Sequence, residues 1–193
     1  MPFLKRGGGF RSLKVFQITE IVFDIAYYFS HRYLWVGDRT VDQIVQAARS
    51  GKQNIAEGSA ASTTSREMEI KLTNVARASL QELLLDFEDY LRVRKLEQWT
   101  SSHPRFKPLR QYVRSDKFRQ EYSTLLEKMN DEELANMSIT LIHQADYLLQ
   151  RLLEKQQDQF LAEGGIREQM TRARIRHRNA KSDGSNNVEN SDK

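Results

Sequence analysis

The sequence predicts an all-α protein: an up-and-down four-helix bundle with a short helical insert between the third and fourth helices and a basic C-terminal arm. Only three prolines occur, at Pro2, Pro104 and Pro108, so long stretches are free of this helix breaker. Apolar residues recur at steps of three and four along four long segments, as on the buried face of a helix. No segment of useful length alternates between apolar and polar residues as a strand would.

The expected domain boundaries follow composition. The bundle begins after a glycine run and ends at the pair Gly164-Gly165, beyond which the chain is basic and then polar. The resulting parts are a flexible lead-in at 1–9, the bundle at 10–163 with its insert at about 100–129, a basic arm at 164–181 and a disordered tail at 182–193.

The first helix is apolar on more than one side. Its main stripe steps by three and four residues and consists of Val15, Ile18, Val22, Ile25 and Phe29. Phe16, Phe23 and Tyr27 lie outside this stripe, where a monomer would expose them. We therefore expect these three residues to form the interface of a homo-oligomer.

Capping residues mark where the next helices begin and end. Asp38 is the expected N-cap of the second helix, and Gly58 its expected end. Thr64 and Glu67 form the spacing of a capping box at the start of the third helix.

The fourth helix has the clearest signature. Asn130 and Glu133 form a second capping box. The stripe that follows alternates steps of four and three and consists of Leu134, Ser138, Leu141, Ala145, Leu148 and Leu152. Within the preceding insert, Ser115 is expected to cap a short amphipathic helix.

Composition limits the chemistry. Cysteine is absent, which excludes disulfides and thiolate sites and suits a reducing compartment. No run approaches the length of a membrane span, so we expect a cytoplasmic protein with no membrane partner. None of the four histidines stands in a Glu-x-x-His pair, and we expect no metal and no cofactor.

Basic residues are concentrated on either side of an acidic fourth helix. The net charge is +4 over residues 104–130, −5 over 131–163 and +5 over 164–181. Guanidinium groups suit phosphate, and Phe106, Tyr112 and Phe118 in the insert suit unpaired bases. The candidate nucleic-acid-binding residues are Arg105, Lys107, Arg110, Arg114, Lys117, Arg119, Arg172, Arg174, Arg176 and Arg178. The alternative is that these residues are solvated or pair with the acidic helix of a neighbouring subunit.

Three motifs in order carry a family resemblance: residues 10–17, 43–59 and 79–83. Together they resemble the bacterial four-helix-bundle family of ribosomal RNA intervening-sequence proteins and retroelement accessory variability proteins, in particular its longer suffix-domain subgroup. Val45 and Gln46 stand where many relatives carry two consecutive arginines. The resemblance implies a homopentameric ring and, in the retroelement member, binding to a reverse transcriptase and to nucleic acid.

Two motifs raise the question of catalysis. Asn54 and Glu57, next to Gly58, could supply an acid or base, but the simpler interpretation is a structural motif whose hydrogen bonds tie the end of the second helix to the backbone or to a neighbouring subunit. Arg172 and His177 have the Arg-x4-His spacing of small HEPN-type helical ribonucleases. The sequence therefore predicts a non-enzymatic homo-oligomeric scaffold that binds nucleic acid, a protein partner or both, with a ribonuclease using Arg172 and His177 as the alternative.

Overall fold

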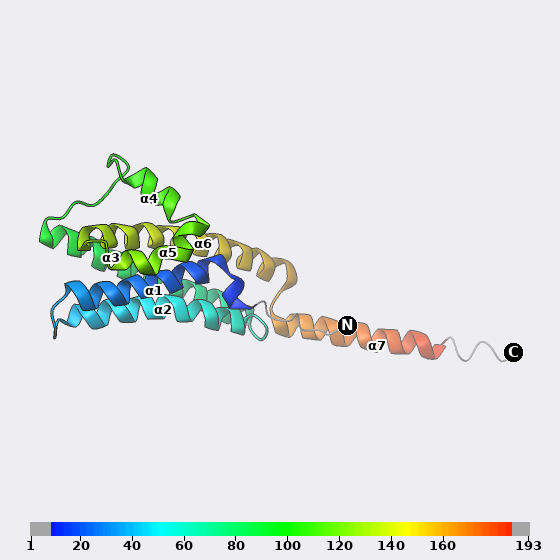
Figure 1. Cartoon of the computed structure of the whole chain (residues 1–193). Coiled ribbons are helices and arrows are strands. Elements are labelled where there is room, and N and C mark those ends of the chain that lie inside the picture. Colours follow the sequence, from blue (N-terminus) through cyan, green and yellow to red (C-terminus); the bar gives the residue numbers. More distant parts are fainter. Residues whose placement is uncertain (1–8, 187–193) are drawn as a thin grey trace.

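The computed structural model describes residues 9–186, and every regular element in this range is helical, as predicted (Figure 1). The elements are a 3₁₀ turn η1 (Phe10–Ser12) and the helices α1 (Lys14–Tyr33), α2 (Arg39–Ala61), α3 (Arg66–Arg94), α4 (Phe106–Tyr112), α5 (Asp116–Leu126), α6 (Asp131–Glu163) and α7 (Ile166–Asn186). All but the last residue of the expected lead-in, together with residues 187–193 of the expected tail, lie outside the described range.

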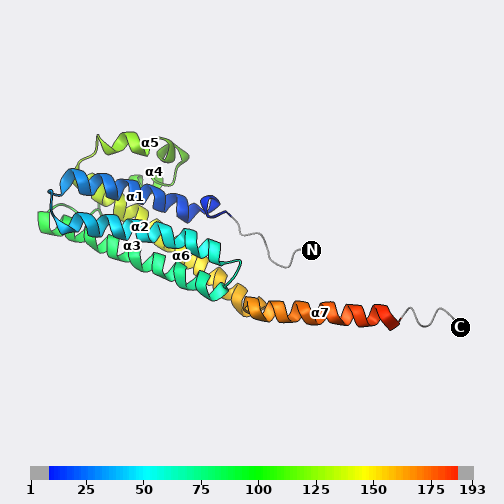
Figure 2. The ribbon, with the colours of Figure 1, turned by 90° about the horizontal axis from the view of Figure 1, so that it is seen from below.

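Four long helices enclose the core. α1 contacts α2 and α6, and α3 contacts the same two helices, so the four lie side by side around one apolar interior (Figures 1 and 2). Residues of the predicted stripes are its centre: Val22, Ile25 and Phe29 from α1 meet Leu134 and Leu141 from α6, all without solvent exposure. Among the described residues, none of the helices has the length and apolar character that crossing a membrane requires.

Local capping predictions hold at three helices and fail at one. Asp38, Ser115 and Asn130 are N-caps whose side chains accept a backbone N–H, and Glu133 completes the capping box with Asn130. The cap of α3 is Ser65 rather than Thr64, with the Met68 N–H donating to Ser65 Oγ at 3.2 Å. The Thr64 hydroxyl instead donates to the Ala61 carbonyl at 3.2 Å within the preceding turn.

Gly58 does not end α2, contrary to the prediction. The helix continues to Ala61, and Gly58 is buried where α2 crosses α3. A Cβ at this position would lie 3.4 Å from the Glu69 carbonyl oxygen and 3.4 Å from Leu72 Cβ. These are ordinary van der Waals distances, so Gly58 is a buried residue inside α2 and is not a helix terminator.

The apolar sides of α1 are largely covered within the chain, because α2, α5, α6 and η1 all pack against it. Phe16, expected in an oligomer interface, is 5% exposed and packs edge-on against Phe10, with ring centroids 4.7 Å apart. Its side chain is therefore core, which corrects that expectation. Phe23 is partly covered, with Lys52 Nζ 4.0 Å from its ring centroid, and Tyr27 is exposed.

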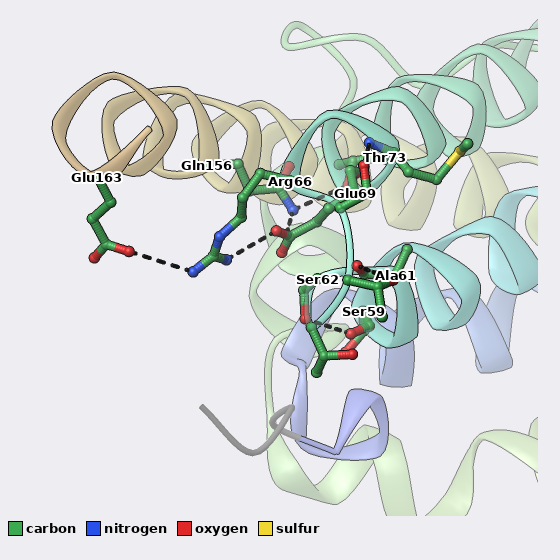
Figure 3. Close-up of polar contacts among 12 residues, drawn as sticks. Ser59, Ala61, Ser62, Arg66, Glu69, Thr73, Gln156 and Glu163 are labelled. Carbon is green, nitrogen blue, oxygen red and sulfur yellow. Dashed lines mark hydrogen bonds and ion pairs between the residues drawn. The ribbon is translucent and has the colours of Figure 1, made fainter. Parts of the chain in front are cut away.

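A polar cluster fastens the start of α3 to the end of α6 (Figure 3). Gln156, only 5% exposed, donates to Glu69 Oε1 at 3.2 Å and to Thr73 Oγ1 at 3.1 Å. Arg66 bridges Glu69 at 3.1 Å and Glu163 at 3.7 Å. Since these bonds join the two longest bundle helices, they fix the register of α3 against α6.

The basic arm forms a helix that projects away from the bundle (Figures 1 and 2). α6 ends at Glu163, and Gly164 turns the chain with a φ of 73°. α7 then runs to Asn186, so residues 182–186 are helical although the sequence placed them in a disordered tail. No residue of 166–179 is buried.

Candidate nucleic-acid interface

The insert leans over α6 and leaves a groove of about 600 Å³ between them. Its position is fixed by Trp99, whose backbone N–H donates to Asn136 Oδ1 at 2.7 Å and whose indole N–H donates to Glu132 Oε1 at 3.1 Å. Trp99, Val113 and Ile139 are buried and give the groove an apolar floor. These two hydrogen bonds hold the chain that leads into α4 against α6.

The charged residues that line this groove are arginines, and no carboxylate lines it. Arg110 and Arg114 line it from the insert, and neither forms an ion pair with any described residue. The Arg110 guanidinium lies 5.3 Å from the centroid of the Phe106 ring, which also lines the groove. Two free guanidinium groups beside an aromatic ring can bind a phosphate and stack on a base.

From α6 the groove receives Thr140, His143, Gln144 and Tyr147. The Gln144 amide forms no hydrogen bond with a described residue, and its Oε1 is buried without a donor. A buried acceptor without a donor is uncommon in native proteins. The sequence analysis did not identify these residues, although their spacing by three and four beside the core stripe of α6 was a usable signal.

The remaining basic residues of the insert are mostly engaged within the chain. Arg105 pairs with Glu133 at 2.9 Å, Lys117 with Glu121 at 3.9 Å and Arg119 with Asp116 at 3.5 Å. Lys107 is exposed and has no partner among the described residues. The predicted cluster therefore divides into a groove pair and a set that is largely neutralised by nearby carboxylates.

Two of the three aromatic residues expected to stack on bases serve the fold instead. Phe118 is fully buried, because the insert needs a core of its own against the bundle. The Tyr112 hydroxyl donates to Glu121, and burial together with this hydrogen bond raises the pKa of Tyr112 to about 12. Only Phe106 keeps the position that the sequence analysis gave it.

The second predicted surface is α7. Arg172 contacts Glu168 at 3.9 Å and donates to the Glu163 carbonyl at 3.2 Å. Arg174, Arg176 and Arg178 are exposed and have no described partner. This helix thus presents free guanidinium groups on a projecting rod.

Arg172 and His177, the candidate ribonuclease pair, both lie on α7. Five residues along a helix correspond to a rotation of about 140°, so the two side chains leave α7 in different directions. Both residues are exposed. The described residues also contain no cluster of three or more potential metal ligands.

The motif of Asn54, Glu57 and Gly58 lies inside α2. Asn54 Nδ2 donates to the Ser50 carbonyl at 2.9 Å, and Ser50 Oγ hydrogen-bonds with Ser79 Oγ at 2.8 Å, which links α2 to α3. Glu57 is exposed and bonds with no described residue. The structural contribution of the motif within the chain therefore comes from Asn54 and Gly58.

The molecule thus carries two basic surfaces of different kinds: a groove with an apolar floor and a projecting helix. Comparison with protein-family models, with curated proteins and with solved structures finds no match for this chain.

Proposed function

We propose that this protein is a non-enzymatic, nucleic-acid-binding scaffold built on an up-and-down four-helix bundle. The observation that carries the proposal is the groove between α4 and α6, where Arg110 and Arg114 stand without carboxylate partners beside Phe106. A basic groove with an aromatic wall combines the two contacts that single-stranded nucleic acid offers, phosphate and base face.

The groove is suited to one nucleotide unit. Its volume of about 600 Å³ lies in the range of small-molecule sites. Val113 and Ile139 supply an apolar floor for a base. An apolar floor accepts the face of any base, so this contact favours a base without selecting its identity.

The projecting helix adds affinity that does not depend on sequence. Arg174, Arg176 and Arg178 are free to neutralise phosphates and release counterions. Binding should therefore weaken with salt, with a log–log slope of about 0.7 to 0.9 per phosphate contacted.

We further propose that the protein works as a homo-oligomer in the cytoplasm and belongs to the four-helix-bundle family that its motifs resemble. Repetition of both basic surfaces in an assembly raises avidity for a polyanion. A pentamer is the state that the resemblance implies, and a protein partner would use the same assembly. Light scattering coupled to size exclusion measures the mass of the assembly, which divided by the 22.6 kDa mass of one chain gives the number of subunits.

The test measures binding of a short fluorescent single-stranded oligonucleotide by anisotropy across a range of salt concentrations. The double variant Arg110→Ala/Arg114→Ala should lower the salt slope by about 1.5, because two phosphate contacts are lost. The matched control is Lys117→Ala/Arg119→Ala, which removes the same charge from the insert where carboxylates already pair with it. The control should leave the slope nearly unchanged.

Two results contradict the proposal. The first is an absence of binding to both RNA and DNA at low salt and micromolar protein. The second is RNA cleavage that His177→Ala abolishes, which would establish the ribonuclease alternative.

A further inference from the structure

A second stripe runs along α3 on the side opposite the core. Met68 is 45% exposed, Val75 39% and Leu85 60%, all well above the exposure of core residues. The eight positions of this stripe alternate steps of three and four, and all are exposed: Met68, Lys71, Val75, Ala78, Glu82, Leu85, Asp89 and Arg92. Below we call this set the α3 outer stripe.

Every face of an α-helix repeats at steps of three and four, so this stripe is distinguished by its exposed apolar side chains. Four of its eight positions are apolar: Met68, Val75, Ala78 and Leu85. Within the chain, however, α3 contacts α2 and α6 through its opposite face, where Leu80, Leu83 and Phe87 are buried. Figure 2 shows α3 on the side of the bundle away from α4 and α5. The α3 outer stripe therefore exposes apolar side chains that no other described helix of the chain covers.

Two charges of the α3 outer stripe, Lys71 and Asp89, are placed so that each can meet the other on a second copy. Lys71 lies near the start of the helix and Asp89 near its end. Consider the α3 helix of a second copy that runs antiparallel to the first, with the two helices meeting midway between Ala78 and Glu82. In this register Val75 of one copy lies opposite Leu85 of the other, Lys71 opposite Asp89 and Ala78 opposite Glu82. A parallel pair in register would instead place Lys71 on Lys71 and Asp89 on Asp89.

We propose that two copies of this chain pair through the α3 outer stripe, antiparallel and about a two-fold axis that crosses α3 near Ala78 and Glu82. Each contact then occurs twice, as a two-fold interface requires. Val75 of each copy packs on Leu85 of the other, and Lys71 of each copy pairs with Asp89 of the other.

The acidic half of α3 supports this arrangement. Burial raises the pKa of Asp86, and the nearby charges of Asp89 and Glu82 raise it further, so negative charge is crowded there. The cation that Asp89 already contacts is Arg92 at 2.6 Å, and both side chains are largely exposed to water, which weakens such a pair. Lys71 forms no ion pair with a described residue, so a second copy would bring a free cation to this region.

The pair leaves both basic surfaces open. The groove lies between the insert and α6, and α7 projects beyond the bundle, so neither belongs to the α3 outer stripe. Pairing through α3 is thus compatible with nucleic-acid binding and does not depend on it.

The test exchanges the two charges and measures mass by light scattering coupled to size exclusion. The wild-type protein should have twice the 22.6 kDa mass of one chain, or ten times the mass of one chain if two pentameric rings pair through α3. Lys71→Asp alone places like charges together twice per pair, and Asp89→Lys alone does the same, so each should weaken pairing at least tenfold. Both sites are exposed, and circular dichroism should confirm that the helices are intact.

Mixing the two single variants is the decisive measurement. A Lys71→Asp chain next to an Asp89→Lys chain regains both opposite-charge contacts, so the mixture should pair although neither variant does alone. The double variant Lys71→Asp/Asp89→Lys should pair with itself. A register shifted by one heptad would set Lys71 against Glu82 and would be insensitive to Asp89→Lys, which would overturn the proposed register.

Cysteine cross-linking tests the apolar contact in a chain that has no cysteine of its own. A mixture of Val75→Cys and Leu85→Cys chains should form a disulfide-linked pair under mild oxidation, and neither variant alone should do so at a comparable rate. A monomeric wild-type protein would overturn the proposal. So would an oligomer whose mass is unchanged in both charge variants and whose mixed cysteine variants fail to cross-link.

Discussion

α6 and α7 follow one another in the chain, separated by two glycines, yet they are helical for different reasons. α6 buries an apolar face that includes Leu134, Leu141 and Leu149. Residues 166–179 of α7 bury no side chain, and its recorded contacts are local, such as the Arg172 to Glu168 pair. Tertiary packing stabilises the first helix, whereas the second depends on propensity and short-range pairs over residues 166–179.

This contrast predicts that the bundle determines the stability of the protein and that α7 presents positive charge to solvent. Substitutions in the bundle should change the free energy of unfolding, because each buried side chain there has several neighbours. Substitutions on α7 should change interactions with polyanions and little else, because its arginines face solvent. The following predictions test that division, from the largest change in stability to the smallest.

Phe29→Ala should be the most damaging of these substitutions. The Phe29 ring is fully buried, with its centroid 5.1 Å from that of Phe87 and 4.6 Å from that of Tyr90. Loss of such a side chain leaves a cavity and should lower the free energy of unfolding by about 3 to 5 kcal/mol. Urea denaturation measures the loss, with Arg176→Ala as the α7 control, expected to stay within about 0.5 kcal/mol of the wild type. Equal effects at the two sites would remove the distinction between the helices.

Gln156→Ala should have an intermediate effect. The truncation leaves Glu69 and Thr73 without their shared donor in a buried place, at a cost of about 1 to 3 kcal/mol. The matched control is the adjacent Gln157→Ala, whose side chain is exposed. If both variants unfold at the same urea concentration, the polar cluster of Figure 3 does not fasten α3 to α6.

Tyr122→Phe should cost about 1 kcal/mol near neutral pH, because the Tyr122 hydroxyl donates to Asp24 at 2.6 Å and so joins α5 to α1. Burial and this hydrogen bond raise the pKa of Tyr122 to about 12 in the folded chain, against 10.0 as the ordinary value. The folded state therefore favours the neutral phenol. The stabilising contribution is fully present below pH 10 and is lost as the pH rises through about 12.

The free-energy difference between Tyr122→Phe and the wild type should accordingly shrink between pH 10 and about 12, as measured by urea denaturation at several pH values. Tyr147→Phe is the control, since the Tyr147 side chain is exposed and has no hydrogen bond with a described residue. A free-energy difference that stays constant across this range would show that the Tyr122 hydroxyl does not donate a stabilising hydrogen bond to Asp24 in the folded chain.

The sequence predicted those parts of the fold that are encoded locally. The stripe of α1 and the caps Asp38, Ser115 and Asn130 depend on residues within a few turns of each other, so spacing was sufficient. The stripe of α6 was predicted correctly only as far as Ala145, because beyond it Leu149 and Leu153 are buried whereas the predicted Leu148 and Leu152 are only partly covered. Thr64 and Ser65 were harder to tell apart, because two neighbouring hydroxyls compete for one cap.

Features that depend on contacts between distant residues were missed. Glycine is common at helix ends, and the sequence alone does not show that α2 continues past Gly58 to Ala61. Arg110 of α4 and Gln144 of α6 line the same groove. No periodicity in the sequence predicts that these two distant residues lie close together. The sequence alone is compatible with Phe118 as a base-stacking ring or as a core residue, and only the packing of α5 shows that it is buried.

Removal of α7 should have the smallest effect on stability and a large effect on binding. A chain that ends at Gly165 keeps every buried residue of the bundle and the Arg66 to Glu163 contact, so its free energy of unfolding should change by less than about 1 kcal/mol. The salt slope for oligonucleotide binding should fall by about 2 to 3, since the three free arginines Arg174, Arg176 and Arg178 are lost. Thermal unfolding followed by circular dichroism and anisotropy titrations measure the two quantities on the same preparation. If the truncated chain melts at a much lower temperature, α7 packs on the bundle or on another copy, and its arginines stabilise the assembly instead of reaching a nucleic acid.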